Sequence, residues 1–434
     1  MALADLQTGR ALRHRVPRAA HGKWRPPKRN ILTILSADNR GRIDALVPIR
    51  NGRMLVSPFT FLRGAAAVMA YDLSTTPSTG FRVQACGDSH LLNFGAFATP
   101  ERRIAFDVND FDETLPAPWE WDVKRLAASV TVAGRHLGAR ESRCREATAA
   151  AVEGYRKEIL WLATLDPLSR WYQRIDAASV AALGISEPEA ETAPASVGQF
   201  HRLIEQRDEV WQIRDEPPLV FHPRRGDRTL HHLRQFVERY RETLPDDRRI
   251  LFDNYRLVDV AIKVVGVGSV GRRAAIGVFV SGDGSPILLQ FKEAVASVLE
   301  RYSGRSGYKN HGQRVVEGQR LMQSASDLFL GWSRIDALDA EFYVRQLRDR
   351  KTAANIDAMD VRELADYATS CGWALARAHA KATNPAPIAG YLGQSDRFDQ
   401  AICKFARTYA DQNEADYATL RAAAKAGKIP VEKS

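Results

Sequence analysis

Residues 86–95, which read CGDSHLLNFG, place an Asp and an Asn five positions apart between glycines. Apolar neighbours raise the cost of desolvating a charge, so Asp88 needs either a partner or a chemical task. This spacing is typical of phosphoryl-transfer loops, in which the Asp reaches an attacking hydroxyl and the Asn reaches Mg²⁺. Gly87 would let the backbone approach closely. We therefore predict that Asp88 is catalytic and that Asn93 binds metal.

Three further carboxylates, Asp107, Asp110 and Asp112, follow within the segment FDVNDFDE. Mg²⁺ prefers oxygen ligands and keeps several waters, so one of these residues would complete the metal site. The same carboxylates, together with Asp88 and His90, could instead form the dinuclear centre of a metal-dependent phosphoesterase, with ions about 3.5–4 Å apart. For His90, a hydrogen bond within its own loop is the simpler role.

A second group of chemically suggestive residues lies roughly 170 positions later. The segment GVGSVG holds Gly266, Gly268 and Gly271 around Ser269, and Lys292 follows in ILLQFKEA. In a dinucleotide-binding fold such a glycine loop must open a helix. In a kinase it joins two strands and covers the ATP phosphates, and a Lys lies on the third strand. Gly271 is followed by RRAAIGVFV and a hairpin turn, so the kinase arrangement is favoured over a dinucleotide site or a glycine-rich hairpin without a ligand.

These motifs resemble the protein-kinase-like superfamily, especially its aminoglycoside phosphotransferase and choline kinase branch. That branch has His-Gly-Asp-x-His-x-x-Asn, and CGDSHLLN differs by Cys86 at the His position. NDFDE resembles the branch's Ile-Asp-Phe-Asp segment, which implies that Asp110 binds metal, although the distance of Asp107 from Asn93 is closer to the usual one. WDVKRLA resembles a later helix, with Asp122 as a structural capping acid. From about residue 50 the chain also resembles a widespread bacterial family described only as a domain of unknown function.

The resemblance implies a Mg-ATP-dependent phosphotransferase that acts on a hydroxyl of an unidentified acceptor, a small molecule rather than a protein. Asp88 would accept the hydroxyl proton, while the glycine loop and Lys292 would bind the phosphates of ATP. A Lys at this place pairs with a helix acid, for which we expect Glu317, with Glu293 and Glu300 as competitors. A nucleotide-binding regulator without catalysis would use the glycine loop but leave the Asp–Asn spacing unexplained.

The order of the motifs is inverted relative to ordinary kinases, because the Asp–Asn loop precedes the glycine loop. We therefore expect an α+β, two-lobed kinase-like fold in circularly permuted order, which is acceptable because termini often lie close together. Lys292 and the glycine loop should then face Asp88, Asn93 and Asp110 across one cleft. The expected divisions are a basic flexible arm (1–45), a helical C-lobe-like region with the metal hairpin (46–250), an N-lobe-like sheet (251–350) and a returning helical segment (351–434).

Local patterns predict the elements that position these residues. FGAFATPERRIAFDVNDFDE predicts a β-hairpin, and the Val- and Ile-rich stretch from residue 258 predicts three antiparallel strands. LFLGWSR and EFYVRQLRD predict further strands, and GQRVVEGQRLMQSASD predicts a helix. In RELADYATSCGWALARAHAKA, apolar residues and His379 share one helical face. The acid- and Pro-rich stretch GISEPEAETAPAS predicts a mobile excursion.

Composition limits the remaining possibilities. The net charge is +10, but much of the excess positive charge lies in RALRHRVPRAAHGKWRPPKRN. The sequence has no basic motif interleaved with aromatic residues, so we expect no nucleic-acid binding beyond non-specific contact by this segment. No apolar run is long enough to span a bilayer. The four cysteines are scattered without a CxxC pair, which indicates reduced thiols in a cytoplasmic protein.

Overall fold

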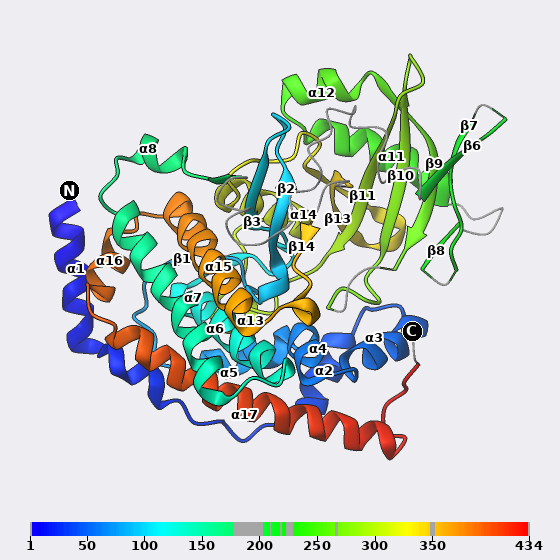
Figure 1. Cartoon of the computed structure of the whole chain (residues 1–434). Helices are drawn as coiled ribbons and strands as arrows, with labels where there is room; N and C mark the ends of the chain where they lie inside the picture. Colours follow the sequence, from blue (N-terminus) through cyan, green and yellow to red (C-terminus); the bar gives the residue numbers. More distant parts are fainter. Residues whose placement is uncertain are drawn as a thin grey trace.

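The computed structural model describes residues 2–176, 203–208, 210–217, 219–222, 229–264, 268–347 and 352–432. Figure 1 shows two parts, a bundle of helices and a twisted antiparallel sheet, with a small hairpin between them. The fold is therefore mixed, with helices and antiparallel sheets. The acid- and Pro-rich stretch GISEPEAETAPAS lies outside the described residues.

The helical part is built on four long helices, α6 (Trp119–His136), α7 (Glu141–Leu162), α15 (Val361–Ala382) and α17 (Arg397–Lys425). α15 begins at a capping box between Asp360 and Glu363, and the apolar face predicted for it is buried. It packs closely on α7, since a Cβ at Gly372 would lie 2.2 Å from the Ala151 carbonyl oxygen. The C-terminal helices thus join the bundle formed by the first half of the chain.

The first residues are not the flexible arm that the composition predicts. They form α1 (Ala2–Arg15), a 3₁₀ turn (Arg18–Lys23) and α2 (Ile31–Asn39), and they pack on α16 (Ala386–Leu392) and α17. Arg13 Nε donates to the Tyr391 carbonyl at 2.8 Å, and Arg29 bridges the buried carboxylates of Asp72 and Asp416, each at 2.6 Å. Arg13 and Arg29 are therefore bound by partners that are distant in sequence.

The large sheet has the order β12–β13–β11–β10–β9–β8, and all of its pairs are antiparallel. Its members are β8 (Val220–Phe221), β9 (Tyr255–Lys263), β10 (Ala274–Ser281), β11 (Pro286–Ala294), β12 (Gly331–Ile335) and β13 (Ala340–Gln346). The three strands predicted from residue 258 and the two later strands are confirmed. Helix α14 (His311–Met322) lies between β11 and β12 in the chain, in the stretch predicted to be helical.

Each face of the sheet is covered by a different element. α11 (Thr229–Glu242) and α12 (Asp246–Phe252) pack on one face around Phe279 and Phe291. The hairpin of β6 (Ile204–Arg207) and β7 (Val210–Ile213) packs around Ile276 and Leu288 on the other. Successive side chains of a strand point to opposite faces, so Lys292 shares the face of Leu288 and Gln290.

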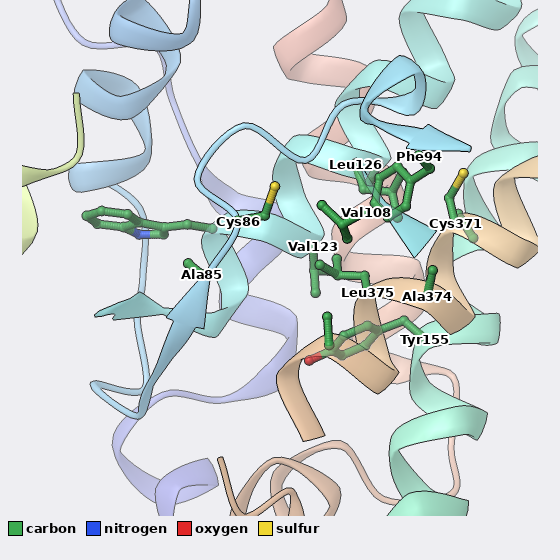
Figure 2. Packing of buried hydrophobic residues seen from close by; sticks show 14 of the residues in the cluster. Ala85, Cys86, Phe94, Val108, Val123, Leu126, Tyr155, Cys371, Ala374 and Leu375 are labelled. Atoms are coloured by element: carbon green, nitrogen blue, oxygen red, sulfur yellow. The ribbon is translucent and has the colours of Figure 1, made fainter. Parts of the chain in front are cut away.

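The predicted β-hairpin is also confirmed, as β2 (Phe94–Ala98) and β3 (Ile104–Val108), flanked by β14 (Thr352–Ala353) and β5 (Ile175–Asp176). β1 (Arg82–Ala85), which precedes the Asp–Asn loop, pairs with β4 (Leu115–Pro118). Figure 2 shows Phe94 and Val108 of the hairpin packed among Leu126 of α6 and Leu375 of α15. This core fixes both ends of the Asp–Asn loop.

The cysteines Cys86, Cys144, Cys371 and Cys403 are all free and buried. None of these four cysteines forms a disulfide. Among the helices that the structure describes, none combines the length and apolar character needed to cross a membrane.

Candidate functional site

The two motif groups meet at one cavity of about 140 Å³ between the helical part and the sheet. Its lining includes Asp88, Asn93 and Asp110 from the first group, and Gly268 and Ser269 from the second. Lys292 approaches this lining through Asp110, with 3.6 Å between its Nζ and Oδ2 of the carboxylate. Asp88, Asn93, Asp110, Gly268 and Ser269 therefore share one cavity, whereas Lys292 lies behind Asp110 and does not line it. We call this space the central cavity.

The Asp–Asn loop is held by a buried carboxylate on α6. Asp122 accepts hydrogen bonds from the backbone N–H groups of Cys86 at 2.6 Å and Gly87 at 2.9 Å. It also lies 3.1 Å from Nε2 of His379, whose Nδ1 is 2.9 Å from the Tyr155 hydroxyl. Asp122 is thus the capping acid that its motif implied, and His379 is a packing histidine.

Gly87 makes the turn that presents Asp88. Its φ is +85°, in the left-handed region that favours glycine, and a Cβ there would lie 2.3 Å from the Glu113 carbonyl oxygen. The close approach predicted for this glycine is confirmed. No side chain fits between the loop and residue 113 without a backbone shift.

Asp88 faces the central cavity with a side chain that is 17% exposed. Nε of Arg125, on α6, donates a hydrogen bond to Oδ1 of Asp88 at 2.8 Å, and Nη2 of Arg125 lies 2.6 Å from the same oxygen. Burial raises the pKa of Asp88 above its ordinary value, although the Arg125 guanidinium acts in the opposite direction. The carboxylate is therefore oriented by an arginine and made more basic by its surroundings.

Asn93 closes the loop on itself. Its Nδ2 donates to the Asp88 carbonyl at 2.6 Å, and its own carbonyl accepts from the Asn109 N–H at 2.8 Å. These bonds fix the side chain with its amide group at the cavity lining. An amide oxygen held in this way is a suitable ligand for a hard cation.

The structure separates the two rival metal carboxylates. Asp107 is fully buried outside the cavity, where it pairs with Arg377 and accepts the Ser324 N–H at 2.7 Å. Asp110 follows the end of β3 and lines the central cavity. Asp107, which we also expected as a metal ligand, is instead bound to a buried arginine, because α15 brings Arg377 against the hairpin.

Lys292 does not meet the partner that we expected. It contacts Asp112 directly, and Asp112 also accepts from the Tyr343 hydroxyl at 2.8 Å and the Ser269 hydroxyl at 3.2 Å. Burial lowers the pKa of Lys292, but the carboxylates of Asp110 and Asp112 outweigh it and hold that pKa above its usual range. The lysine therefore stays charged at neutral pH.

The three glutamates considered for Lys292 have other partners. Glu317 pairs with Arg320 on α14 at 2.9 Å, and the expectation that it meets Lys292 is corrected. Glu293 pairs with Arg273 at 2.7 Å, and Glu300 lies 3.7 Å from His311. A helical acid is unnecessary at Lys292 because the hairpin already supplies two carboxylates.

The glycine segment lies between β9 and β10, as the kinase arrangement requires. Gly266 is outside the described residues, whereas Gly268, Ser269 and Gly271 are described, and Gly271 has a φ of +89°. Arg42 donates at 2.7 Å to the carbonyls of both Gly268 and Val270. The segment is therefore anchored to residues that precede the helical bundle.

Polar side chains occupy the sheet face next to Lys292. Arg345 of β13 donates from Nε to Gln290 at 3.1 Å and from Nη1 to the Asn109 carbonyl at 3.3 Å. Neither Gln290 nor Arg345 lines the central cavity, which opens toward residues 293–298. The cavity thus lies beyond the end of β11, on the side of Asp88.

Several site residues had no sequence signal. Arg314 of α14 donates to the carbonyls of Thr114 at 2.6 Å and Asp112 at 2.8 Å, so it ties the helix to the acidic segment. Four other arginines line the central cavity: Arg42, Arg50, Arg63 and Arg272. In a chain rich in arginine, periodicity could not distinguish these residues from surface charges.

A dinuclear metal centre finds less support in this geometry. Within the described ranges, no group of three or more His, Cys, Asp and Glu side chains is arranged to hold a metal ion. Asp107 is occupied by Arg377, and Nε2 of His90 lies 3.8 Å from Asp88 Oδ2. A mononuclear site that adds the Asn93 amide and water to one carboxylate fits Mg²⁺ better.

Comparisons with known proteins give a family but no function. No curated protein and no solved structure matches the chain. A family model described as "Uncharacterized protein conserved in bacteria (DUF2252)" matches residues 42–423, which include both motif groups and all the cavity arginines. The match covers most of the chain. The chain therefore belongs to this conserved bacterial family, a domain of unknown function.

Proposed function

We propose that this protein is a Mg-ATP-dependent phosphotransferase that transfers a phosphoryl group to a hydroxyl of a small acceptor. One observation carries the proposal: the central cavity brings Asp88, Asn93 and Asp110 together with the glycine segment across a long separation in sequence, and Lys292 contacts Asp110 behind this lining. Phosphoryl transfer needs both groups at the same phosphates.

Asp88 is the proposed catalytic residue. It would orient the acceptor hydroxyl and accept its proton as the new oxygen–phosphorus bond forms and the bond to the leaving diphosphate breaks. The raised pKa of Asp88 makes its carboxylate a better proton acceptor, and Arg125 keeps Oδ1 in place. Positioning remains its larger contribution, because a carboxylate is a weak base.

Asn93 and Asp110 would hold the magnesium ion. One carboxylate and one amide oxygen, completed by phosphate oxygens and water, suit a cation that seldom uses a cage made only of protein ligands. Mg²⁺, when bound, neutralises charge on the phosphates. Asp110 lies 3.6 Å from Lys292, so the residue that would hold the metal and the lysine are neighbours.

Lys292 and the glycine segment would bind the phosphates, with Asp112 as their positioning residue. Asp112 contacts Lys292, Ser269 and Tyr343, which belong to the third strand, the glycine segment and β13. It thus takes the place that we had assigned to Glu317. Lys292 would be held at a defined point behind Asp110 and Asp112, which line the cavity.

The arrangement of the sheet supports a kinase-like fold in permuted order as part of this proposal. The glycine segment joins β9 and β10, Lys292 lies on β11, and α14 follows before β12 and β13. The same succession of glycine loop, third-strand lysine and helix characterises protein kinases. Here it comes after the catalytic loop and metal hairpin instead of before them.

The deciding experiment is a calorimetric titration of ATP with excess Mg²⁺ against wild type, Asp88→Asn, Lys292→Ala and Asp110→Asn. Asp88→Asn should retain nucleotide affinity while phosphoryl transfer falls about 10³-fold, within the range typical of a lost general base. Lys292→Ala and Asp110→Asn should each weaken binding by about tenfold or more. The exposed Glu101→Gln, on the same hairpin, is the matched control.

Different outcomes would favour the alternatives. Unchanged affinity in both the Lys292 and Asp110 variants would remove them from the site and overturn the proposal. Nucleotide binding without any transfer, even in wild type with a broad set of hydroxyl acceptors, would favour a regulator. Stabilisation by Mn²⁺ or Zn²⁺ alone would favour a phosphoesterase. A larger loss of Mg-dependent binding in Asp107→Asn than in Asp110→Asn would show that the metal ligand is misassigned.

A further inference from the structure

The four arginines of the central cavity fall into two classes. Arg42 and Arg50 share the carboxylate of Asp38, at 3.1 and 2.6 Å, and also donate to backbone carbonyls. Arg63 and Arg272 lie within 4 Å of no described carboxylate. The proposed roles of Asp88, the metal ligands and Lys292 involve neither of these two arginines.

Arg63 is the more isolated of the pair. It ends α4 (Pro58–Gly64), it is half-buried, and its side chain makes no hydrogen bond to a described residue. Its Nε is fully buried without a partner among those residues. Desolvation lowers the pKa of Arg63, and the charge of Asp88 opposes the change, so the guanidinium lies within electrostatic reach of the proposed base.

Arg272 belongs to the other wall and follows the glycine segment. Its only described side-chain hydrogen bonds are long ones to the carbonyls of Arg40 at 3.4 Å and Asp38 at 3.5 Å. Burial lowers the pKa of Arg272, and the neighbouring Arg42 lowers it further, whereas the charges of Asp38, Glu293 and Glu113 oppose the change. A second cation without a described carboxylate in direct contact therefore lines the same cavity.

His90 adds a buried group on the same side as Arg63. Its side chain lines the cavity, the residue is 5% exposed, and its Nδ1 has no hydrogen-bond partner among the described residues. Burial lowers the pKa of His90 well below its usual value, as do Arg125 and Arg63, so the ring is neutral. A neutral imidazole with one unused nitrogen can bind a ligand without adding charge.

The energetics point to a ligand of opposite charge. Carboxylates of the cavity lining act on both arginines from a distance, but none lies within 4 Å of either guanidinium, and a partly buried cation without a contacting partner is costly. Guanidinium groups bind phosphate and carboxylate oxygens through two parallel hydrogen bonds. The cavity lining also includes Gly64 and Ala66 at the start of α5 (Ala66–Ser74), where no described side chain caps the helix.

We propose that Arg63, with Arg272 and His90, forms an oxyanion subsite beside Asp88, and that the acceptor is a small hydroxyl compound carrying a phosphate or carboxylate group. The identification of the ligand as the acceptor rests on the proposed function. Nε2 of His90 lies 3.8 Å from Asp88, and Arg63 lines the same cavity, whereas Lys292, Asp112 and Ser269 form the cluster assigned to the donor phosphates, with Arg272 next to it. The anionic group anchors the acceptor and places its hydroxyl at Asp88.

The test uses full-length protein and two simple probes, inorganic phosphate and acetate, titrated separately by calorimetry. Arg63→Ala should weaken binding of the preferred probe by at least about tenfold, and Arg272→Ala should weaken it to a smaller extent. Arg63→Lys should retain part of the affinity, because it keeps the charge but loses the planar fork. Arg143→Ala, an exposed arginine on α7, removes the same charge elsewhere and should change nothing.

A parallel titration with Mg-ATP separates this inference from the proposed function. Loss of phosphate or acetate binding in Arg63→Ala with unchanged Mg-ATP affinity supports an acceptor subsite. An equal loss of probe affinity and Mg-ATP affinity would assign the arginines to the donor phosphates and overturn the acceptor subsite. Equal probe affinity in wild type and both variants, or no probe binding by wild type, would overturn the subsite itself.

The result does not depend on whether the protein binds nucleotide. If Mg-ATP fails to bind while probe binding still requires Arg63, the anion subsite stands and the phosphotransferase proposal fails. Thermal unfolding of each variant verifies the fold. Arg63 has no hydrogen-bond partner to lose among the described residues, so its replacement should leave the unfolding midpoint almost unchanged.

Discussion

The two walls of the central cavity are built in different ways. The Asp–Asn loop, residues 86–93, is held from below by buried side chains: Asp122 at its start, the Ser129 hydroxyl at the Leu91 N–H, and the Tyr367 hydroxyl at two carbonyls. The described part of the glycine segment, residues 268–271, is held by Arg42, by backbone bonds from Ile43 and Arg272, and by one hydroxyl bond to Asp112.

This difference matches what each wall is proposed to do. Groups that perform chemistry gain most from being held in place before the substrate arrives. A segment that covers phosphates needs close backbone approach more than fixed side chains, which explains the use of glycine. Variants on the two walls should therefore differ in their effects on stability.

The largest effect is expected for Asp122→Ala. The change leaves the buried N–H groups of Cys86 and Gly87 without acceptors and removes the carboxylate beside His379. Unsatisfied buried donors cost ~1–3 kcal/mol each, so the free energy of unfolding should fall by about 3–5 kcal/mol. Arg42→Ala, which loses the two carbonyl contacts of the other wall and an ion pair with Asp38 that Arg50 retains, should cost about 1–2 kcal/mol. Urea unfolding of both variants measures the two losses of unfolding free energy. Equal losses would contradict the proposed difference between the two walls.

The second comparison uses two glycines with similar backbone angles. Gly87 and Gly271 have φ values of +85° and +89°, so alanine is strained at both, by about 1–2 kcal/mol. At Gly87 the new Cβ would also lie 2.3 Å from a backbone oxygen, whereas at Gly271 the nearest atom would be the Arg42 Cβ at 3.0 Å, a less severe overlap. Gly87→Ala should therefore lose about 3 kcal/mol and Gly271→Ala about 1–2 kcal/mol in the same unfolding assay. A larger loss at Gly271 would mean that its segment is the more rigid of the two.

A pH dependence is expected where the walls meet, at Glu113. Burial raises the pKa of Glu113 from 4.5 to about 7 in the folded protein, although Arg314 acts in the opposite direction. Below pH 4.5 the carboxyl is protonated in both folded and unfolded chains; between pH 4.5 and 7 only the unfolded chain releases the proton. Stability should therefore fall by about 2–3 kcal/mol as pH rises through this window.

The control for this pH effect is Glu113→Gln, which keeps the shape and removes the titration. Unfolding free energies of wild type and variant, measured from about pH 4.5 to about pH 8, should converge at the acid end and diverge toward neutral pH, with the variant the more stable. Parallel curves would show that Glu113 ionises normally in the folded protein.

The smallest effect is expected for Ser269→Ala. Its only described side-chain bond is the one to Asp112 at 3.2 Å, and Asp112 retains Lys292 and Tyr343 without it. The free energy of unfolding should change by less than about 1 kcal/mol. If the segment covers phosphates, Mg-ATP affinity should fall by no more than a few fold. A loss comparable to that of Lys292→Ala would make Ser269 a direct ligand instead of a support.

Local patterns predicted a large part of this protein. The spacing of Asp88 and Asn93, the glycine before them, the hairpin that carries Asp110, the strands around Lys292 and the buried face of α15 all follow from the sequence and agree with the structure. Such features depend on residues close together in the chain, where periodicity and turn chemistry fix the conformation. The sequence also predicted that two distant motif groups should share one cavity, because phosphate chemistry requires both.

Only the tertiary structure decided which partner each charge would have. Asp107 and Asp110 are three residues apart, yet α15 brings Arg377 to the first and leaves the second at the cavity. Lys292 pairs with the hairpin instead of Glu317, and the basic N-terminal residues meet Asp72, Asp416 and the carbonyls of α16. The isolated position of Arg63 likewise has no local signature. A charge is neutralised by whatever lies within a few ångströms of it, and that distance is set by the packing of segments far apart in the chain.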